Sequence, residues 1–150
     1  IKVNNKISKY FIKKYYEPEL QLKFVNSLLK LANTSIDISD GLIDDLKKMI
    51  NRQSVSFHIF EKDIPISNTL SQLIKIKKFK KINITSKGDD YQILFTANPI
   101  KSRIIKRISD NTGIKITKIG KIISGKNKSK IINIKNKEIE AKNKGYIHQF

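Results

Sequence analysis

Four aspartates stand within nine consecutive positions of the segment SIDISDGLIDDL, although the whole chain has only 13 acidic residues among 150. They are Asp37, Asp40, Asp44 and Asp45. Clustered carboxylates repel one another, and Mg²⁺ prefers oxygen ligands such as those of Asp and Ser, so the cluster indicates a cation site. Asp37 and Ser39 would share one face of a short strand, because side chains in a strand alternate with a period of two.

Helix capping is the competing interpretation of the same segment. Ser39 or Asp40 would then be the N-cap of the following helix, with Asp44 and Asp45 in its first turns. The N-terminus of that helix would also offer unpaired N–H groups to phosphate oxygens. Capping leaves Asp37 unexplained, so the sequence by itself leaves both interpretations open.

Two further segments carry side chains that could take part in chemistry. KGDDYQILFT places Asp89 and Asp90 in a turn before a strand, and GYIHQF ends the chain with Tyr146, His148 and Phe150. Taken singly, the first is ordinary turn chemistry and the second is a docked C-terminal segment. The pattern of either segment alone therefore assigns no function.

The helices that must position these side chains follow from the hydrophobic spacing. Apolar residues recur at helical intervals in four segments, at 18–33, 40–50, 68–79 and 99–112. The helix at 40–50 would bury a stripe formed by Leu42, Ile43, Leu46, Met49 and Ile50. Gly113 is expected to end the last helix.

Alternating apolar residues predict strands at 35–39, 54–62 and 91–95, followed by strands from Ile114 to about Ile139 with turns at Gly120 and Gly125. His58 would lie on the outer face of the second strand, and we assign it no catalytic role. Mixed helices and hairpin-like strands indicate a single α+β domain, with helices layered on a mostly antiparallel or mixed sheet.

The formal net charge of +18 identifies no specific partner. Only three of the 31 basic residues are arginine, the residue on which nucleic-acid readers rely for bidentate and stacked contacts. Lysine, isoleucine and asparagine all have A/T-rich codons, so the genome can explain the bias. A basic nucleic-acid-binding domain, supported by the lysine runs KIKKFKK and GKNKSK, is therefore the weaker alternative, and we expect no specific nucleic acid as a partner.

The composition also limits the location of the protein. The chain has no cysteine, which excludes disulfides and thiolate metal sites. It has no apolar run near the ~20 residues of a membrane span, so we expect a cytoplasmic protein that does not contact a membrane. Because the chain begins with Ile1, we expect it to be cut from a longer polypeptide.

Taken in order, the three segments resemble one family. DISDGL, GDDYQILFT and GYIHQF are similar to the patterns (S/A)xDxSDGLxxDL, GGEDYELxFT and GYDHF of the thiamine-monophosphate kinases. These enzymes are members of the aminoimidazole ribonucleotide synthetase superfamily. The resemblance covers most of residues 18–150 and is to the C-terminal half. The chain departs from the patterns at Lys87, Asp89, Gln92 and in the tail, which has one extra residue before Phe150.

The resemblance implies that residues 1–150 are the C-terminal domain of an enzyme that transfers the γ-phosphoryl group of ATP to thiamine monophosphate. By position, Asp37 and Asp40 would bind Mg²⁺, Ser39 would contact ATP, and Asp89 and Tyr146 would contact thiamine monophosphate. The N-terminal domain of the family, which carries most of the Mg²⁺-binding aspartates and builds a homodimer, is absent from this chain. Another member of the superfamily with a different phosphate substrate is the alternative within enzymes.

The implied pocket makes a geometric prediction. Asp89 and Tyr146 should face the same cleft as Asp37. The 88–91 turn and the terminal segment should then lie where the helix after Ser39–Asp40 begins.

Overall fold

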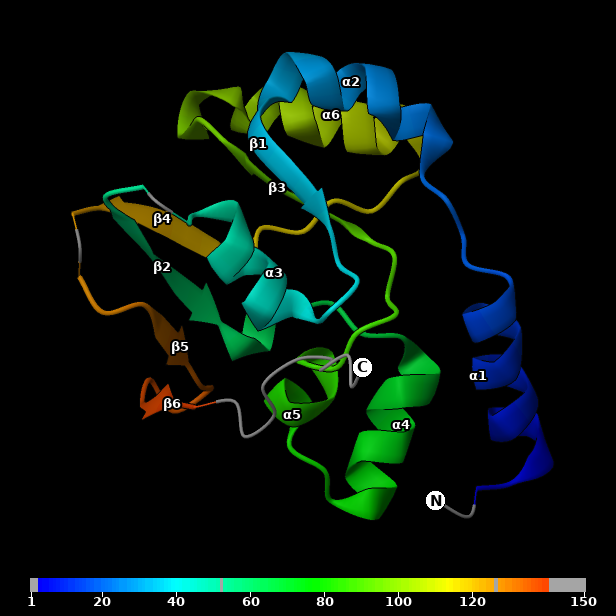
Figure 1. Ribbon diagram of the computed structural model, residues 1–150. Coiled ribbons are helices and arrows are strands. Elements are labelled where there is room, and N and C mark those ends of the chain that lie inside the picture. Colours follow the sequence, from blue (N-terminus) through cyan, green and yellow to red (C-terminus); the bar gives the residue numbers. More distant parts are fainter. Residues whose placement is uncertain (1–2, 52, 126, 141–150) are drawn as a thin grey trace, which may run out of the picture.

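The computed structural model, which describes residues 3–51, 53–125 and 127–140, combines helices and strands and ends in three successive strands (Figure 1). The helices are α1 (Asn5–Tyr16), α2 (Val25–Leu31), α3 (Leu42–Met49), α4 (Asn68–Lys77), α5 (Lys81–Thr85) and α6 (Ser102–Thr112). Short 3-10 helices lie at Leu22–Phe24, Glu61–Asp63 and Pro99–Lys101. The strands are β1 (Ala32–Asp37), β2 (Val55–Phe60), β3 (Ile93–Ala97), β4 (Gly120–Ser124), β5 (Lys130–Ile132) and β6 (Glu138–Ile139).

The strands form a two-stranded and a four-stranded sheet within the described residues. β1 pairs antiparallel with β3, and the other sheet has the order β4-β2-β5-β6, in which only the β2–β5 pair is parallel. Helices α2 and α6 cover the β1–β3 pair, and α3 lies between this pair and the larger sheet (Figure 1). The predicted α+β class with a mostly antiparallel, mixed sheet is confirmed.

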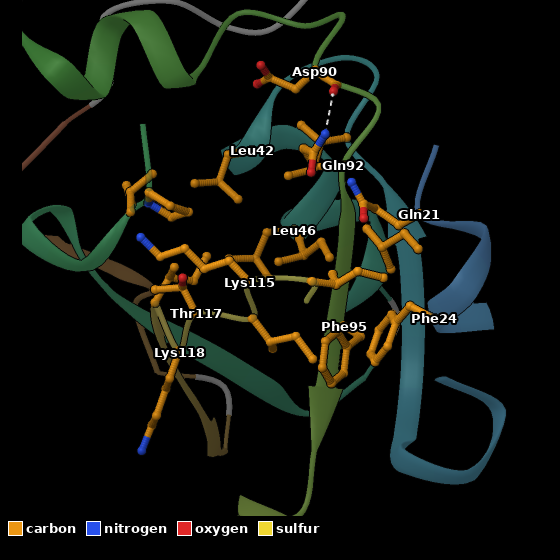
Figure 2. Close-up of a pocket in the computed structure, with 18 of the residues that line it drawn as sticks. Gln21, Phe24, Leu42, Leu46, Asp90, Gln92, Phe95, Lys115, Thr117 and Lys118 are labelled. Atoms are coloured by element: carbon orange, nitrogen blue, oxygen red, sulfur yellow. Dashed lines mark hydrogen bonds between the residues drawn. The ribbon is translucent and has the colours of Figure 1, made fainter. Parts of the chain in front are cut away.

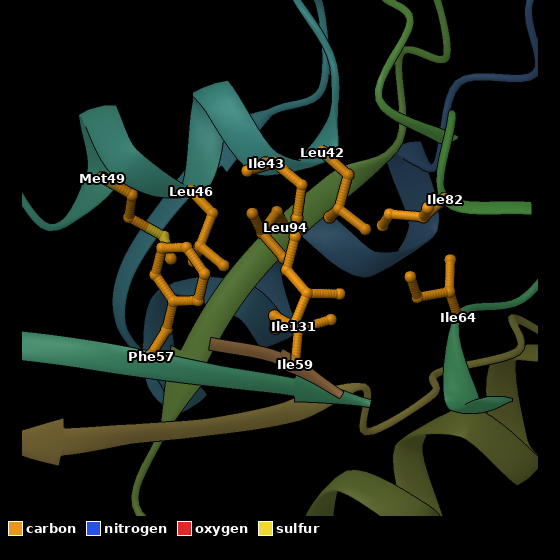
Figure 3. Packing of buried hydrophobic residues seen from close by; sticks show 10 residues of the cluster. All are labelled: Leu42, Ile43, Leu46, Met49, Phe57, Ile59, Ile64, Ile82, Leu94 and Ile131. Carbon is orange, nitrogen blue, oxygen red and sulfur yellow. The ribbon is translucent and has the colours of Figure 1, made fainter. Parts of the chain in front are cut away.

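A cluster of buried apolar side chains joins α3 to both sheets (Figure 3). Its members are Leu42, Ile43, Leu46, Met49, Phe57, Ile59, Ile64, Ile82, Leu94 and Ile131. The first four form the stripe predicted for this helix, while Ile50 is only partly buried against the cluster. Burying one large apolar side chain contributes about 1.5–3 kcal/mol, so this packing fixes α3 firmly. The loop that leads into α3 is fixed with it.

The N-terminal part of the chain differs from the prediction. The helix expected at 18–33 begins only at Val25, after the 3-10 helix in which Phe24 is buried against Phe95, with 5.5 Å between ring centroids. Before it lies α1, which the hydrophobic spacing did not reveal. Asn4 caps α1 by accepting a hydrogen bond from the N–H of Ile7 at 2.9 Å, and none of its residues, all of which the structure describes, is buried.

Smaller differences occur at strand ends and turns. Between the helix predicted at 68–79 and the strand predicted at 91–95, the structure has a further short helix, α5, which is held by the buried side chain of Ile82. Gly120 begins β4 rather than forming a turn, because β2 approaches it so closely that a Cβ atom there would lie 2.2 Å from the carbonyl oxygen of His58. Gly113 and Gly125 end α6 and β4 as predicted, both with positive φ. In the part of the chain that the structure describes, no helix has the length and apolar character needed to cross a membrane.

Candidate functional site

The aspartate loop, residues 37–41, connects the end of β1 to the start of α3. Alternation along β1 directs Ile36 and Ile38 toward the core cluster and leaves Asp37 exposed. No hydrogen bond or ion pair from any described residue reaches the Asp37 carboxylate. Asp37 is therefore open to a cation or another ligand from solvent.

Asp45, in the first turn of α3, holds the backbone of the aspartate loop through hydrogen bonds. Its Oδ2 accepts hydrogen bonds from the backbone N–H groups of Ser39 at 2.9 Å, Asp40 at 2.9 Å and Gly41 at 3.1 Å. The residue is 0% exposed. The N-cap of α3 is Gly41, and it makes no side-chain cap. The competing interpretation, in which Ser39 or Asp40 caps the helix, is therefore wrong, because a carboxylate from the first turn reaches back to satisfy these N–H groups.

This arrangement also answers the expectation that the start of α3 could bind phosphate. Three N–H groups of residues 39–41 point at one carboxylate oxygen, so Asp45 already supplies the anion that they attract. Any phosphate at this loop must therefore be held through other groups.

Lys48 links Asp45 to Asp40. Its Nζ donates to Oδ1 of Asp45 at 2.8 Å and also forms an ion pair with Oδ2 of Asp40. Burial by itself would raise the pKa of Asp45, but the hydrogen bonds from Lys48 and from the N–H groups of Asp40 and Gly41 outweigh burial and hold this pKa below its usual value. The same carboxylates raise the pKa of Lys48. Asp45 is thus a buried, charged anchor.

Asp44 has a different environment from its neighbour. Its carboxylate is 25% exposed and accepts a hydrogen bond from Lys47 at 2.7 Å on the outer face of α3. The four clustered aspartates therefore have four environments: Asp37 is open, Asp40 is paired with Lys48, Asp45 is a buried anchor and Asp44 is a surface residue. Both Asp44 and Asp45 lie in the first turn of α3, as the capping interpretation placed them, but only Asp45 reaches back to the loop.

The segment 86–92 packs directly against the aspartate loop. The N–H of Asp89 donates to the carbonyl oxygen of Ser39, and the N–H of Tyr91 donates to the carbonyl oxygen of Ile38, both at 2.9 Å. A Cβ atom on Gly88 would lie 1.9 Å from the carbonyl oxygen of Ser39. The 88–91 turn therefore lies beside the N-terminus of α3, as predicted. Tyr146 and the rest of the terminal segment lie outside the described residues, so their place stays a prediction.

Tyr91 is a residue that sequence reasoning missed as a member of this site. It lies before β3 rather than in it, and its hydroxyl donates to Oδ1 of Asp89 at 3.3 Å. The charge of Asp89, and more weakly that of Asp37, raises the pKa of Tyr91. Both Asp89 and Tyr91 have positive φ, 67° and 50°, which non-glycine residues seldom adopt outside functional sites and tight turns. The position of Tyr91 directly after Asp89 and Asp90 was the signal in the sequence that could have identified it as part of the site.

A large cleft of the domain is lined by Ile38 of the aspartate loop and by the 88–91 turn, and Figure 2 shows Asp90 and Gln92 at it. It has a volume of about 2720 Å³, well above the ~300–1,000 Å³ of a usual small-molecule pocket, so it is an open face rather than a pocket. Asp89 and Asp90 line it, and Gln92 donates to the carbonyl oxygen of Asp90 at 3.3 Å. Asp37 does not line it, because the alternation of β1 directs its side chain away. The prediction that Asp37 and Asp89 face the same cleft is therefore wrong for this cleft. The two residues are linked instead through Tyr91, on which both of their charges act.

Asp90 should give the turn a stability that depends on pH. The carboxyl group of Asp90 loses hydration in the turn although the residue as a whole is exposed, and this loss, with secondly the charge of Asp89, raises the pKa of Asp90 to about 6, against about 3.9 in an unfolded chain. Because the residue is exposed, solvent screening keeps the effect on stability small. The neutral form is favoured in the fold, so its contribution is complete below about pH 4 and is lost as the pH rises through about 6. Asp90→Asn should therefore melt at the same temperature as the wild type near pH 4 and at a higher temperature near pH 8. A difference in melting temperature that is constant across this range would contradict the assignment.

The donor set of the loop fits one half of a magnesium site. In the described ranges no three or more His, Cys, Asp or Glu side chains are grouped so that they could hold a metal ion. Mg²⁺ is commonly bound through one or two carboxylates, with water and substrate phosphates as its other ligands. Asp37 is open, and Asp40 would have to exchange its ion pair with Lys48 for the metal. These two carboxylates therefore suit Mg²⁺ only together with ligands from outside this domain or from a nucleotide.

Comparison with known proteins finds that the chain is similar to the kinases that its motifs resemble. No protein-family model matches the chain. A thiamine-monophosphate kinase of Buchnera aphidicola (subsp. Schizaphis graminum) is 34% identical over 148 residues, which are 97% of this chain and 44% of that protein. The kinase of Aquifex aeolicus is 35% identical over 88 residues, 57% of this chain. The resemblance to the thiamine-monophosphate kinase family is confirmed.

Solved structures of thiamine-monophosphate kinases share the fold of this chain. The structure of AaThiL complexed with AMPPCP and TMP has a TM-score of 0.74 at 25% identity and covers 98% of this chain. A crystal structure of the Aquifex aeolicus kinase gives a TM-score of 0.68, also at 25% identity. This chain spans 44% of the length of each of these structures, and so less than half of the proteins it resembles. Since these relatives are kinases, the nucleic-acid alternative is not favoured.

Proposed function

We propose that this chain is the C-terminal domain of an ATP-dependent kinase that converts thiamine monophosphate to thiamine diphosphate. The observation that supports the proposal is the packing of the 88–91 turn against the aspartate loop, through the hydrogen bond from Asp89 to Ser39. Two segments that carry the kinase-like motifs, about 50 positions apart in the sequence, thus lie side by side. The match to kinases over nearly the whole chain adds to this.

The residues divide between the two substrates. Asp37 and Asp40 would hold Mg²⁺, which neutralises phosphate charge as the phosphoryl group is transferred. Ser39 would contact ATP. Asp89 would pair with the positive thiazolium ring or bind the aminopyrimidine of thiamine monophosphate, and Tyr146 would supply an aromatic face to the cationic ring. The reaction needs positioned charges rather than a protein nucleophile, so a site without cysteine is sufficient.

The site is incomplete in this domain alone. The described residues offer only two carboxylates to the metal, and phosphoryl transfer needs several positive charges around crowded phosphates. The proposal therefore includes an N-terminal domain, with further metal ligands, and a homodimer formed through it. A cytoplasmic location stays a prediction.

The isolated 150-residue chain is therefore expected to form no thiamine diphosphate, whereas the complete polypeptide that carries it should. Both proteins would be purified from a host that lacks its own kinase and incubated with Mg²⁺, ATP and thiamine monophosphate, and the product would be quantified by chromatography. Turnover by the isolated chain would show that the site is complete without a second domain. A complete protein that is folded but transfers no phosphoryl group from ATP to thiamine monophosphate would overturn the kinase proposal.

The alternative acceptor is tested in the same assay. Around the acceptor, Lys87 and Gln92 depart from the residues usual in the kinase patterns, so another phosphate compound is the competing substrate. Faster turnover with a different phosphate monoester than with thiamine monophosphate would favour another member of the superfamily.

A further inference from the structure

We propose that Asp45 is a positioning residue that sets the place of the Mg²⁺- and ATP-binding groups of the aspartate loop. The inference rests on the function proposed above, since it concerns the loop that carries Asp37, Ser39 and Asp40. Asp45 itself is 0% exposed and would touch neither substrate. Its effect would pass through the backbone that it holds.

The two oxygens of Asp45 have separate partners. Oδ2 gathers the N–H groups of Ser39, Asp40 and Gly41, and Oδ1 accepts from Lys48 at 2.8 Å. Hydrogen bonds to an ionised acceptor are about twice as strong as neutral ones, and three of them converge here on one atom. The backbone of the loop is thus fixed over three consecutive residues, two of which carry proposed ligands.

Asp45 would also remain the ion-pair partner of Lys48 when a metal ion binds to Asp40. In the structure Lys48 is shared by Asp40 and Asp45. A metal ion at Asp40 would repel the Lys48 ammonium group, which keeps a carboxylate partner in Asp45. Asparagine cannot do both tasks, because its single oxygen can accept from the loop only if its NH₂ group faces the Lys48 ammonium group.

Asp44 is a matched control for Asp45. It is the same residue type in the same turn of α3, but it pairs with Lys47 on the surface and makes no hydrogen bond to the loop among the described residues. A second control, Ile131→Ala, removes a buried side chain of β5 from the core cluster and tests loss of stability alone. The two controls separate a change of charge and a loss of stability from a loss of loop position.

The test titrates Mn²⁺ into the complete protein in the presence of AMPPCP and measures bound Mn²⁺ by electron paramagnetic resonance, at a temperature where every variant is folded by circular dichroism. Asp45→Asn should raise the dissociation constant of Mn²⁺ roughly tenfold or more, since the groups that bind it lose their fixed geometry. Asp44→Asn and Ile131→Ala should stay within about twofold of the wild type. Hydrogen exchange of the amides at 39–41 should accelerate only in Asp45→Asn.

The outcomes separate this inference from the proposed function. If Asp45→Asn binds Mn²⁺ as the wild type does, or no more weakly than an equally destabilised Ile131→Ala, Asp45 is structural only and the inference is overturned. The titration decides this even where the wild type proves inactive toward thiamine monophosphate, a result that would count against the kinase proposal. If Asp45→Asn weakens Mn²⁺ binding while both controls do not, the positioning role is supported whichever acceptor the enzyme uses.

Discussion

Asp37→Asn and Asp40→Asn are each expected to lower the turnover number of the proposed kinase, measured on the complete protein, at least ~10²-fold, because each removes a charge that would hold Mg²⁺ against the developing phosphate charge. Asp37 is the cleaner test, since the described residues give it no hydrogen bond or ion pair to lose. The measurement is the rate of thiamine diphosphate formation at saturating ATP over a range of Mg²⁺ concentrations.

The matched control for this prediction is Asp44→Asn, which changes the same charge on the outer face of α3, where only Lys47 pairs with it among the described residues. It should change turnover by less than about threefold, as surface substitutions usually do. Similar, mild losses at all three positions would show that the cluster serves the folding of α3 rather than the metal.

The elements with strong periodicity were predictable from the sequence. α3 buries four of the five apolar residues of its predicted stripe, and α6 ends at Gly113, whose φ of 69° suits glycine. Local pattern was sufficient because each element's own spacing decides which face is buried. The resemblance in three separate motifs similarly predicted the family before any fold was known.

The role of Asp45 could not be predicted, because it depends on a turn of the chain rather than on a pattern. Ser or Asp before an apolar helix usually predicts a side-chain cap, and here the carboxylate comes from inside the helix. The same limit applies to Tyr91, whose left-handed backbone places it beside Asp89 instead of in β3. In both cases the position of the residue is defined by a hydrogen bond that helix and strand propensities cannot predict.

The N-terminal prediction was wrong for another reason. Pro18 and the glutamates on either side of it are typical of a helix start, yet Leu20 is 62% exposed and α2 begins only after Phe24 has packed on Phe95. Tertiary contact of one aromatic side chain outweighed the local signal for a helix start. The parallel pairing of β2 with β5 could likewise not be predicted from local sequence, because it joins strands about 70 residues apart.

Gly88→Ala should be a strongly damaging single-methyl change near the site. Its Cβ would lie 1.9 Å from the carbonyl oxygen of Ser39 and 3.2 Å from the Cα of Asp40, and both neighbours are backbone atoms that no rotamer change can move. The 88–91 turn must then separate from the aspartate loop, which breaks the 2.9 Å hydrogen bond from Asp89 to Ser39. We expect a loss of about 1–3 kcal/mol in the free energy of unfolding, and a ~10²-fold loss of turnover, since a displacement of about 1 Å in a site can cost that much.

The control for Gly88→Ala is Gly113→Ala. That glycine has a φ of 69°, but an added Cβ would meet no atom within 4 Å, so only backbone strain of about 1–2 kcal/mol is expected, without loss of turnover in the folded enzyme. Thermal melting gives the stability of both variants, and turnover is compared at a temperature where both are folded. A Gly88→Ala enzyme as active as Gly113→Ala would mean that the two loops can separate without consequence. The joint site of the aspartate loop and the 88–91 turn would then have no part in the reaction.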